Sequence, residues 1–352
     1  MKRAIALARR GVGRVSPNPL VGAVVVKDGR IVGEGYHLYE KKDHAEVVAL
    51  ESAGRQAAGA SLYLNLEPCT HHGRTPPCVD RILEAGVREV FVAVRDPNPL
   101  AAEKGTEVLR KQGVCVHEGL CRPEAICLNE KFFHFIQTGK PFVLLKLALT
   151  LDGKIAARSG ESQWITGNKA RKEAHRLRYE YDAILVGVET VLQDDPSLDV
   201  RWRRGNRISK VVLDSRVRTP LHARLFNSSD PVIIFRGRQA SKERVQKLSE
   251  RARVIAVSQR NGRLEWSHLL RKLGQLKITS LLIEGGARVA ASALGAGIVQ
   301  KISFFYGPKI IGGSGRSSIE DLGIEQLARA VKLRAIRLKR LAPDFMVEGD
   351  VE

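Results

Sequence analysis

Four residues in the first quarter of the chain have the types and the spacing of a catalytic zinc site. His44 and Glu46 stand two positions apart, Cys69 and Cys78 follow, and each cysteine comes directly after a proline. A catalytic zinc ion takes three protein ligands and keeps one position for a water molecule, whose pKa it lowers to about 7. One imidazole and two thiolates, from His44, Cys69 and Cys78, would fill the three positions. Glu46 would then move protons to and from the reacting atoms.

Two weaker interpretations of these residues stay open. A His-x-Glu pattern and a buried cysteine each occur by chance, although the four residues together favour zinc. A structural zinc ion would need a fourth protein ligand, which His71 or His72 could supply. The catalytic interpretation is preferred, since His-x-Glu followed by Pro-Cys resembles the zinc nucleobase deaminases. In those enzymes two residues separate the cysteines, whereas eight separate Cys69 from Cys78.

The longer spacing matches one family of deaminases. The run from Cys69 to Cys78 and the Ser-Pro-Asn-Pro-Leu-Val-Gly run at residues 16–22 resemble the bifunctional deaminase–reductases of riboflavin biosynthesis. Further matching segments are Asp-Pro-Asn-Pro at 96–99, Gly-Glu-Ser-Gln-Trp-Ile-Thr at 160–166 and Asp-Asp-Pro at 194–196. The resemblance spans nearly the whole chain. One departure is Asp43, which precedes His44 where the family usually has proline.

For the first half, the resemblance implies a cytidine-deaminase-like three-layer domain that binds Zn²⁺ through His44, Cys69 and Cys78. The implied reaction is hydrolytic deamination of 2,5-diamino-6-ribosylamino-4(3H)-pyrimidinone 5′-phosphate, with Glu46 as the catalytic residue. The substrate-binding residues that the resemblance implies are Asn18, His71, Arg74, Asp96 and Asn98. Arg74 suits the phosphate group, because a guanidinium can bind phosphate through two parallel hydrogen bonds.

For the second half, the resemblance implies a domain similar to dihydrofolate reductase that uses NADPH to reduce the ribosyl side chain to ribityl. The implied cofactor-binding residues are Ala148, Trp164, Thr190, Asp194, Ser215 and Gly286. The implied substrate-binding residues are Ser162, Arg178, Leu198, Arg201 and Glu284, and the two arginines suit a phosphate group. Lys146 and Asp152 are further candidates for catalysis or orientation. The Glu-Gly-Gly segment at 284–286 is not the dinucleotide fingerprint, so no Rossmann domain is predicted.

The elements that must hold these residues alternate between strand and helix patterns, which predicts an α/β fold. Gly139 and Pro141 form a stop signal, so the predicted domains are residues 1–140 and 141–352. An Asp-Gly pair at 28–29 predicts a hairpin, and Asp43 is the expected N-cap of the following helix. Strands are expected at residues 20–26, 31–36, 61–66, 90–94, 142–149, 183–188, 210–214, 231–235, 253–256 and 279–283. Helices are expected at residues 4–10, 77–85, 124–137 and 287–294, besides the one that follows Asp43.

The composition limits the remaining classes of function. The 352 residues, 43% of them hydrophobic, can form about two globular domains. No apolar run reaches the roughly 18 residues of a membrane helix, and the first apolar stretch is too short for a signal peptide. We therefore expect a cytoplasmic protein without a membrane partner. The five cysteines do not indicate a disulfide framework.

The net charge of +20 is concentrated in the second half. It favours anionic partners such as phosphorylated metabolites or a dinucleotide. An RNA-editing deaminase is an alternative, but the long insert between the cysteines would crowd a flipped base, and no RNA-binding motif is found. A second alternative is a deaminase whose second half is inactive or specialised. The intact segments at residues 160–166 and 284–286 argue against it. The expected partner is a small phosphorylated pyrimidine rather than nucleic acid, and the sequence is compatible with a homo-oligomer.

Overall fold

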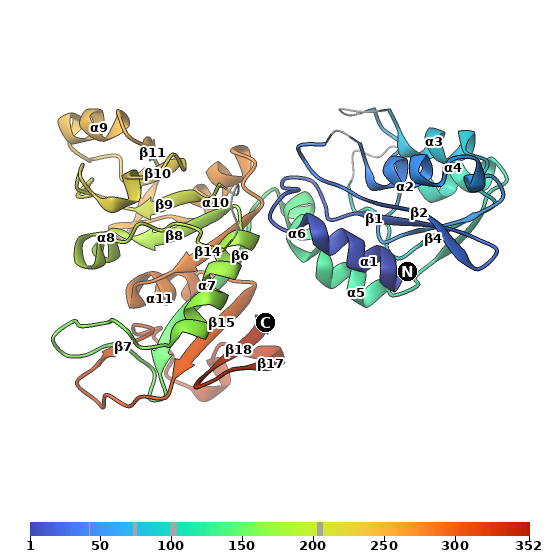
Figure 1. Ribbon diagram of the computed structural model, residues 1–352. Coiled ribbons are helices and arrows are strands. Elements are labelled where there is room, and N and C mark those ends of the chain that lie inside the picture. The colour runs from blue at the N-terminus through green and yellow to red at the C-terminus, as the bar shows by residue number, and fades with distance from the viewer. Residues whose placement is uncertain (42, 73–75, 99–103, 203–206) are drawn as a thin grey trace. The chain divides into compact units, whose positions relative to one another are not determined.

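A computed structural model (Figure 1) describes residues 1–41, 43–72, 76–98, 104–202 and 207–352. The chain forms two compact units, Met1–Gly139 and Lys140–Glu352. Each unit has its own main β-sheet and its own hydrophobic core. Among the described helices, none is both long enough and apolar enough to cross a bilayer.

The first unit is built on a five-stranded sheet with the order β2-β1-β3-β4-β5. Its strands are β1 Gly22–Lys27, β2 Arg30–Tyr36, β3 Ser61–Leu64, β4 Glu89–Val92 and β5 Cys115–Glu118. Strand β1 is antiparallel to β2 and β3, while β3, β4 and β5 are parallel. The predicted hairpin at Asp28 and Gly29 is confirmed, and both residues have positive φ, as a tight hairpin turn of this kind requires.

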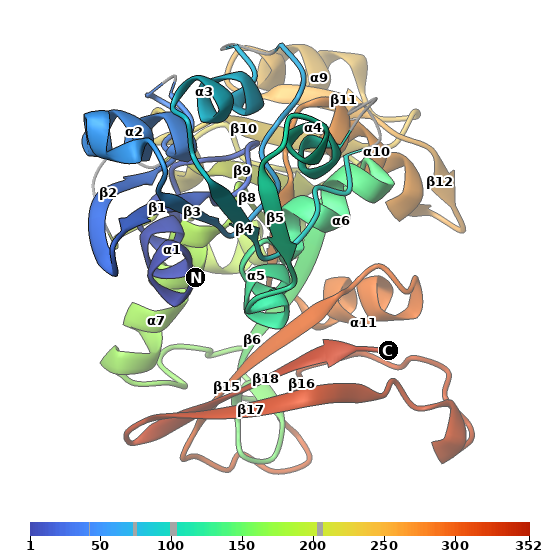
Figure 2. The same cartoon turned by 90° about the vertical axis from the view of Figure 1, so that its right-hand side faces the viewer.

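The helices of the first unit cover both faces of its sheet. They are α1 Lys2–Ala8, α2 Ala45–Ala53, α3 Cys78–Glu84, α4 Gly105–Lys111, α5 Arg122–Leu128 and α6 Glu130–Thr138, with 3₁₀ turns at Arg9–Gly11 and Gly54–Ala57. Figure 2 shows α2, α3 and α4 on one side of the sheet and α1 and α5 on the other. A side chain at Gly35 of β2 would start 2.2 Å from the Ala45 carbonyl oxygen of α2. Glycine therefore lets the start of α2 approach the sheet.

The prediction of a single helix over residues 124–137 is wrong, because two helices, α5 and α6, form there and are separated at Asn129. The Asn129 side chain is buried and pairs with the backbone of Leu20. Its Oδ1 accepts from the Leu20 N–H at 2.8 Å, and its Nδ2 donates to the Leu20 carbonyl at 2.9 Å. This contact, 109 residues apart in sequence, fixes the segment that follows Asn18.

The second unit has a nine-stranded sheet with the order β11-β10-β9-β8-β14-β6-β15-β18-β17. Its strands are β6 Phe142–Thr150, β8 Ala183–Gly187, β9 Ser209–Leu213, β10 Val232–Arg236, β11 Arg253–Ala256, β14 Ser280–Glu284, β15 Lys301–Gly307, β17 Leu333–Leu341 and β18 Asp344–Val351. The strands from β11 to β15 are parallel, and β18 and β17 complete the sheet in antiparallel pairs.

The helices of this unit pack on both faces of the sheet and bury the apolar parallel strands. They are α7 Asn168–Glu180, α8 Val188–Asp194, α9 Lys242–Ser249, α10 Trp266–Gln275 and α11 Ala287–Gly295, with 3₁₀ turns at Arg224–Phe226 and Leu327–Arg329. Short pairs join β7 Lys154–Ala156 to β16 Arg316–Ser317 and β12 Gln259–Arg260 to β13 Arg263–Leu264. The carboxyl ends of β6, β8, β9, β10 and β14 share one edge, where ligands of open α/β sheets usually bind.

Candidate functional site

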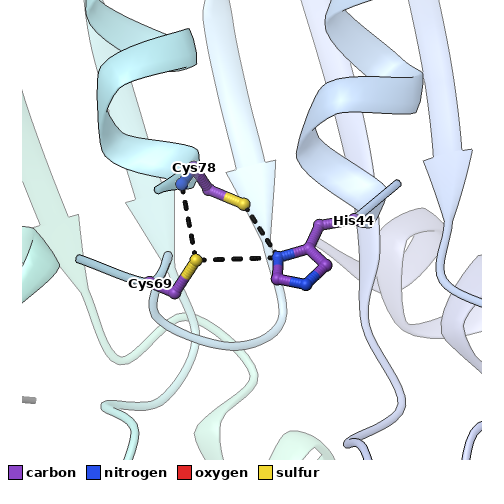
Figure 3. Close-up of side chains that lie close together, drawn as sticks. All are labelled: His44, Cys69 and Cys78. Atoms are coloured by element: carbon purple, nitrogen blue, oxygen red, sulfur yellow. Dashed lines mark hydrogen bonds between the residues drawn. The ribbon is translucent and has the colours of Figure 1, made fainter. Parts of the chain in front are cut away.

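The predicted zinc ligands meet where two helices of the first unit begin (Figure 3). His44 is the N-cap of α2, Cys78 is the first residue of α3, and Cys69 lies in the loop after β3. The His44 Nδ1 atom lies 3.0 Å from the Cys78 sulfur and 3.6 Å from the Cys69 sulfur. One ligand atom from each residue lies within 4.8 Å of the other two. The Cys78 backbone N–H also donates to the Cys69 sulfur at 3.4 Å.

The electrostatics of this cluster suit a metal ion. The pKa of Cys69 falls to about 4, because the Cys78 thiol donates to its sulfur and, against the effect of burial, His44 also favours the thiolate. The shared proton and burial raise the pKa of Cys78. A zinc ion would displace that proton, since thiolates are the ligands that zinc binds. The donor set therefore fits zinc with three protein ligands.

Glu46 lies on the first turn of α2, beside the cluster, and its side chain is buried. Burial and, next, the negative charge of Cys69 raise its pKa to about 7. Its Oε2 atom has no hydrogen-bond partner among the described residues. A buried carboxyl oxygen without a partner is costly in a folded protein. This oxygen is suited to a water molecule or a substrate atom at the metal.

A residue that the sequence analysis missed, His37, connects Asn18 to the zinc cluster. The His37 Nε2 atom lies 3.0 Å from the Asn18 Nδ2 atom, and its Nδ1 atom lies 3.1 Å from the Asp43 carbonyl oxygen. The buried His37 ring packs edge-on against the His44 ring, with centroids 5.4 Å apart. The prediction of Asp43 as N-cap is wrong, because His44 occupies that position and Asp43 supplies its carbonyl to His37.

Glu67 is a second missed residue, and it ties the Asp96 segment to the segment of Cys69. Its buried carboxylate accepts from the Asp96 N–H at 3.0 Å and from the Thr106 hydroxyl at 2.7 Å. Asp96 in turn accepts from the Asn98 N–H at 2.9 Å. Burial raises the pKa of Asp96, against the effects of the hydrogen bond from the Asn98 N–H and of the charge of Lys104. The side chain of His71 is exposed, and Arg74 falls outside the described residues.

In the second unit, a buried ion pair joins two of the predicted substrate-binding residues. The Arg178 Nε and Nη2 atoms donate to the Glu284 carboxylate at 2.8 and 3.0 Å, and Lys146 Nζ lies 3.5 Å from it. Against the effect of burial, the charges of Arg178 and Lys146 lower the pKa of Glu284 to about 2. Arg178 Nη1 donates to the Asp199 carbonyl at 3.0 Å, so all three of its nitrogens have partners.

Two predicted cofactor-binding residues, Thr190 and Gly286, lie near the carboxyl end of β14. Gly285 and Gly286 have φ values of 118° and 75°, and Gly286 is the N-cap of α11. A Cβ at these glycines would lie 3.4 and 3.7 Å from the Thr190 hydroxyl oxygen. Glycine keeps this strand-to-helix turn open, which fits a phosphate group at the helix N-terminus. Asp194 accepts from the Ser162 hydroxyl at 3.5 Å.

The remaining predicted residues occupy separate positions in the second unit. Trp164 is 60% exposed, and the Arg171 guanidinium carbon lies over its ring, 4.2 Å from the ring centroid. Leu198 is buried in the core and has a φ of 55°. Arg201 donates to the Ser197 hydroxyl at 3.2 Å. Ala148 is half-buried in β6, Ser215 follows β9, and Asp152 accepts from the Gly312 N–H at 2.6 Å.

Two family models match the chain. The cytidine and deoxycytidylate deaminase zinc-binding region matches residues 1–94, and the RibD C-terminal domain matches residues 141–347. The riboflavin biosynthesis protein RibD of Actinobacillus pleuropneumoniae is 44% identical over 99% of this chain and 93% of its own length. The corresponding protein of Escherichia coli (strain K12) is 40% identical over 98% of this chain and 96% of its own length.

Solved structures of relatives agree with these matches. The diaminohydroxyphosphoribosylaminopyrimidine deaminase/5-amino-6-(5-phosphoribosylamino)uracil reductase of Thermotoga maritima has a TM-score of 0.88 and 38% identity. It covers 100% of this chain and 97% of its own chain. The first unit thus has a cytidine-deaminase-like fold and the second the reductase fold similar to dihydrofolate reductase. The chain belongs to the RibD family, the bifunctional deaminase–reductases of riboflavin biosynthesis.

Proposed function

We propose that residues 1–140 deaminate 2,5-diamino-6-ribosylamino-4(3H)-pyrimidinone 5′-phosphate and that residues 141–352 then reduce its ribosyl side chain with NADPH. The observation that carries the first assignment is the His44, Cys69 and Cys78 cluster beside the unpartnered oxygen of Glu46. The Thermotoga maritima relative, whose name gives both activities, supports this substrate.

In the deamination, one C–N bond of the pyrimidine is exchanged for a C–O bond, and ammonia leaves. Zinc, when bound by His44, Cys69 and Cys78, supplies the activation of the attacking water molecule. Glu46 accepts a proton from that water and returns protons to the ring nitrogen and to the departing amine. A carboxyl group with a pKa of about 7 suits both directions of transfer near neutral pH.

Other residues of the first unit hold the substrate during this exchange. Asn18, fixed by His37, contacts the pyrimidine, and Asp96 and Asn98 bind the ribose hydroxyls. His71 and Arg74 bind the phosphate. The contacts that support these roles are the hydrogen bonds of Asn18 with His37 and of Asp96 with Glu67.

In the reduction, NADPH, when bound, would supply a hydride to the ribose carbon that is bonded to nitrogen; the bond from that carbon to the ring oxygen breaks, and the oxygen takes a proton from solvent. Thr190 and Gly286 receive the cofactor phosphates at the start of α11, while Ala148, Trp164, Asp194 and Ser215 make further cofactor contacts. Ser162, Leu198 and Arg201 bind the substrate, with Arg201 at its phosphate. Glu284 accepts two hydrogen bonds from Arg178 and stays ionised in the site. Lys146 and Asp152 orient neighbouring groups.

The test uses the full chain and two assays, ammonia release from the diaminopyrimidine and NADPH oxidation with the deaminated intermediate. We expect both activities in the wild-type chain, and zinc chelation should abolish ammonia release alone. If chelation left ammonia release intact, the metal assignment would be wrong. Loss of both activities on chelation would contradict the assignment of two separate sites. The cytoplasmic location and the homo-oligomer remain predictions from the sequence.

A further inference from the structure

Lys210, in the second position of β9, carries a buried charge that the proposed function does not use. Its side chain is completely buried. Ile208 and Val212, two residues to either side, belong to one apolar cluster on the same face of the sheet. A charge is costly to bury, and well-packed hydrophobic residues in its place are often neutral or stabilising. A contribution to stability alone therefore does not account for a lysine at this position.

The Lys210 ammonium joins two segments of the chain that are distant in sequence. Its Nζ atom donates to Asp199 Oδ1 at 2.9 Å, to the Ser228 hydroxyl at 2.8 Å and to the Leu225 carbonyl at 3.1 Å. These three contacts use all three of its N–H donors. A second carboxylate, that of Asp230, lies 3.7 Å away. Against the effect of burial, the hydrogen bond from Lys210 lowers the pKa of Asp199, so this contact joins two opposite charges.

The segment that Lys210 holds through Asp199 carries two residues assigned to the substrate, Leu198 and Arg201. Leu198 has a φ of 55°, in the left-handed region that a bulky side chain rarely adopts. A backbone of this kind persists only where the surrounding structure holds it. The hydrogen bond from Lys210 acts on the next residue along the chain. The shape of this segment therefore depends on a contact from the core of the sheet.

Further contacts connect the same segment to the buried ion pair of the second unit. Arg178 donates to the Asp199 carbonyl at 3.0 Å and, with its other nitrogens, to Glu284. The Arg201 N–H donates to the His175 Nδ1 atom at 3.4 Å. Asp199 is thus held by its side chain from the buried ammonium and by its carbonyl from the arginine. Its position sets the place of the substrate-binding segment relative to Glu284.

We propose that Lys210 is a positioning residue of the reductase site, which through Asp199 holds residues 197–201 in the shape that binds the phosphorylated substrate. This inference rests on the proposed reductase function. A preformed segment binds more tightly than one that must be ordered on binding, because the ordering cost is then met during folding. Loss of the contact should therefore raise the KM of the substrate. The kcat and the KM of NADPH should stay the same, because the contact touches neither the cofactor nor the reacting atoms.

The test changes the two carboxylates beside Lys210 and keeps the lysine, since its removal would disturb the core itself. Steady-state NADPH oxidation by the full-length chain is measured against the deaminated intermediate. Asp199→Ala should raise the KM of the intermediate by about tenfold, or about 1.4 kcal/mol, comparable with the cost of ordering one residue. Asp199→Asn keeps an oxygen acceptor for the ammonium and should recover most of this loss. The matched control, Asp230→Ala, removes the carboxylate outside the substrate segment and should leave the KM unchanged.

The possible results separate the positioning role from the reductase function. An unchanged KM in Asp199→Ala, or an equal rise in Asp230→Ala, would overturn the positioning role and leave the reductase function standing. A similar rise in the KM of NADPH would also overturn it, because that result indicates general loosening of the unit. If a wild-type chain with a normal melting curve did not oxidise NADPH with the intermediate, the reductase function itself would be contradicted, and the positioning role with it.

Discussion

Replacing Arg178 with methionine should strongly destabilise the second unit. Arg178 in α7 donates two hydrogen bonds to Glu284, at 2.8 and 3.0 Å, and both side chains are largely buried. Burial alone would raise the pKa of Glu284, but the charges of Arg178 and Lys146 lower it to about 2, so the carboxylate is ionised at neutral pH. Methionine would fill much of the space but leave this charge with only Lys146, 3.5 Å away.

The expected loss in free energy of unfolding is about 3–5 kcal/mol, the usual cost of removing one partner of a buried ion pair. The pKa of Glu284 gives a similar magnitude, because a fall from 4.5 to about 2 on folding corresponds to about 3 kcal/mol. A lowered carboxyl pKa stabilises the folded state above pH 4.5, and this contribution is lost as the pH falls towards about 2. The difference in free energy of unfolding between the wild-type chain and Arg178→Met should therefore have its full size at pH 7 and become smaller as the pH falls from 4.5 towards about 2.

Urea unfolding followed by tryptophan fluorescence measures this loss, because all three tryptophans of the chain lie in the second unit. The control is Arg288→Met, whose exposed guanidinium lies 3.5 Å from Glu320 and should contribute no more than about 1 kcal/mol. Adding Glu284→Gln to Arg178→Met removes the uncompensated charge and should recover at least about 1 kcal/mol. A loss no larger than that of the control, or no recovery in the double variant, would refute the reasoning.

Three further predictions concern the two reactions. Glu46→Gln should retain zinc and slow ammonia release by about 10²–10⁴-fold, because an amide cannot transfer protons; loss of zinc in a metal assay would instead make Glu46 a ligand. Cys78→Ser should lose zinc and deamination but keep NADPH oxidation with the deaminated intermediate, and parallel loss of both would indicate a shared site or unfolding. Arg201→Ala should weaken the phosphorylated substrate of the reductase by about 1.5–3 kcal/mol, seen as a higher KM, with unchanged ammonia release.

The zinc ligands could be predicted from the sequence because their chemistry is local. His44 and Cys78 stand where helices begin. The types and spacing of His44, Cys69 and Cys78 are recognisable in the sequence, and the fold brings the three side chains together. The strands of both units up to β14, except β5 and the short β7, β12 and β13, were also predictable, because apolar β-branched runs followed by turn residues indicate buried strands.

The supporting residues of the sites could not be predicted, because their roles come from contacts between distant segments. His37 orients Asn18 from 19 residues away, and Glu67 reaches Asp96 across 29 residues. Asn129 breaks a helical pattern to pair with Leu20, 109 residues earlier. A sequence pattern also cannot show that Arg178, a natural candidate for phosphate, is already paired with Glu284.

Strand β17 of the second unit was missed for a different reason. Strand β17 is basic and exposed along almost its whole length, so it lacks the apolar alternation that indicates a half-buried strand. It is held as a strand by pairing with β18, which itself pairs with β15. Secondary structure that depends on a distant partner strand leaves little trace in the local sequence.

The measurement that tests the account most directly is the zinc content of the purified chain together with ammonia release from the diaminopyrimidine phosphate. We predict a single zinc ion per chain, held by His44, Cys69 and Cys78. Removing it with a chelator should abolish ammonia release, and adding zinc back should restore it. A metal-free chain that still released ammonia, or a zinc-loaded chain that released none, would contradict the account.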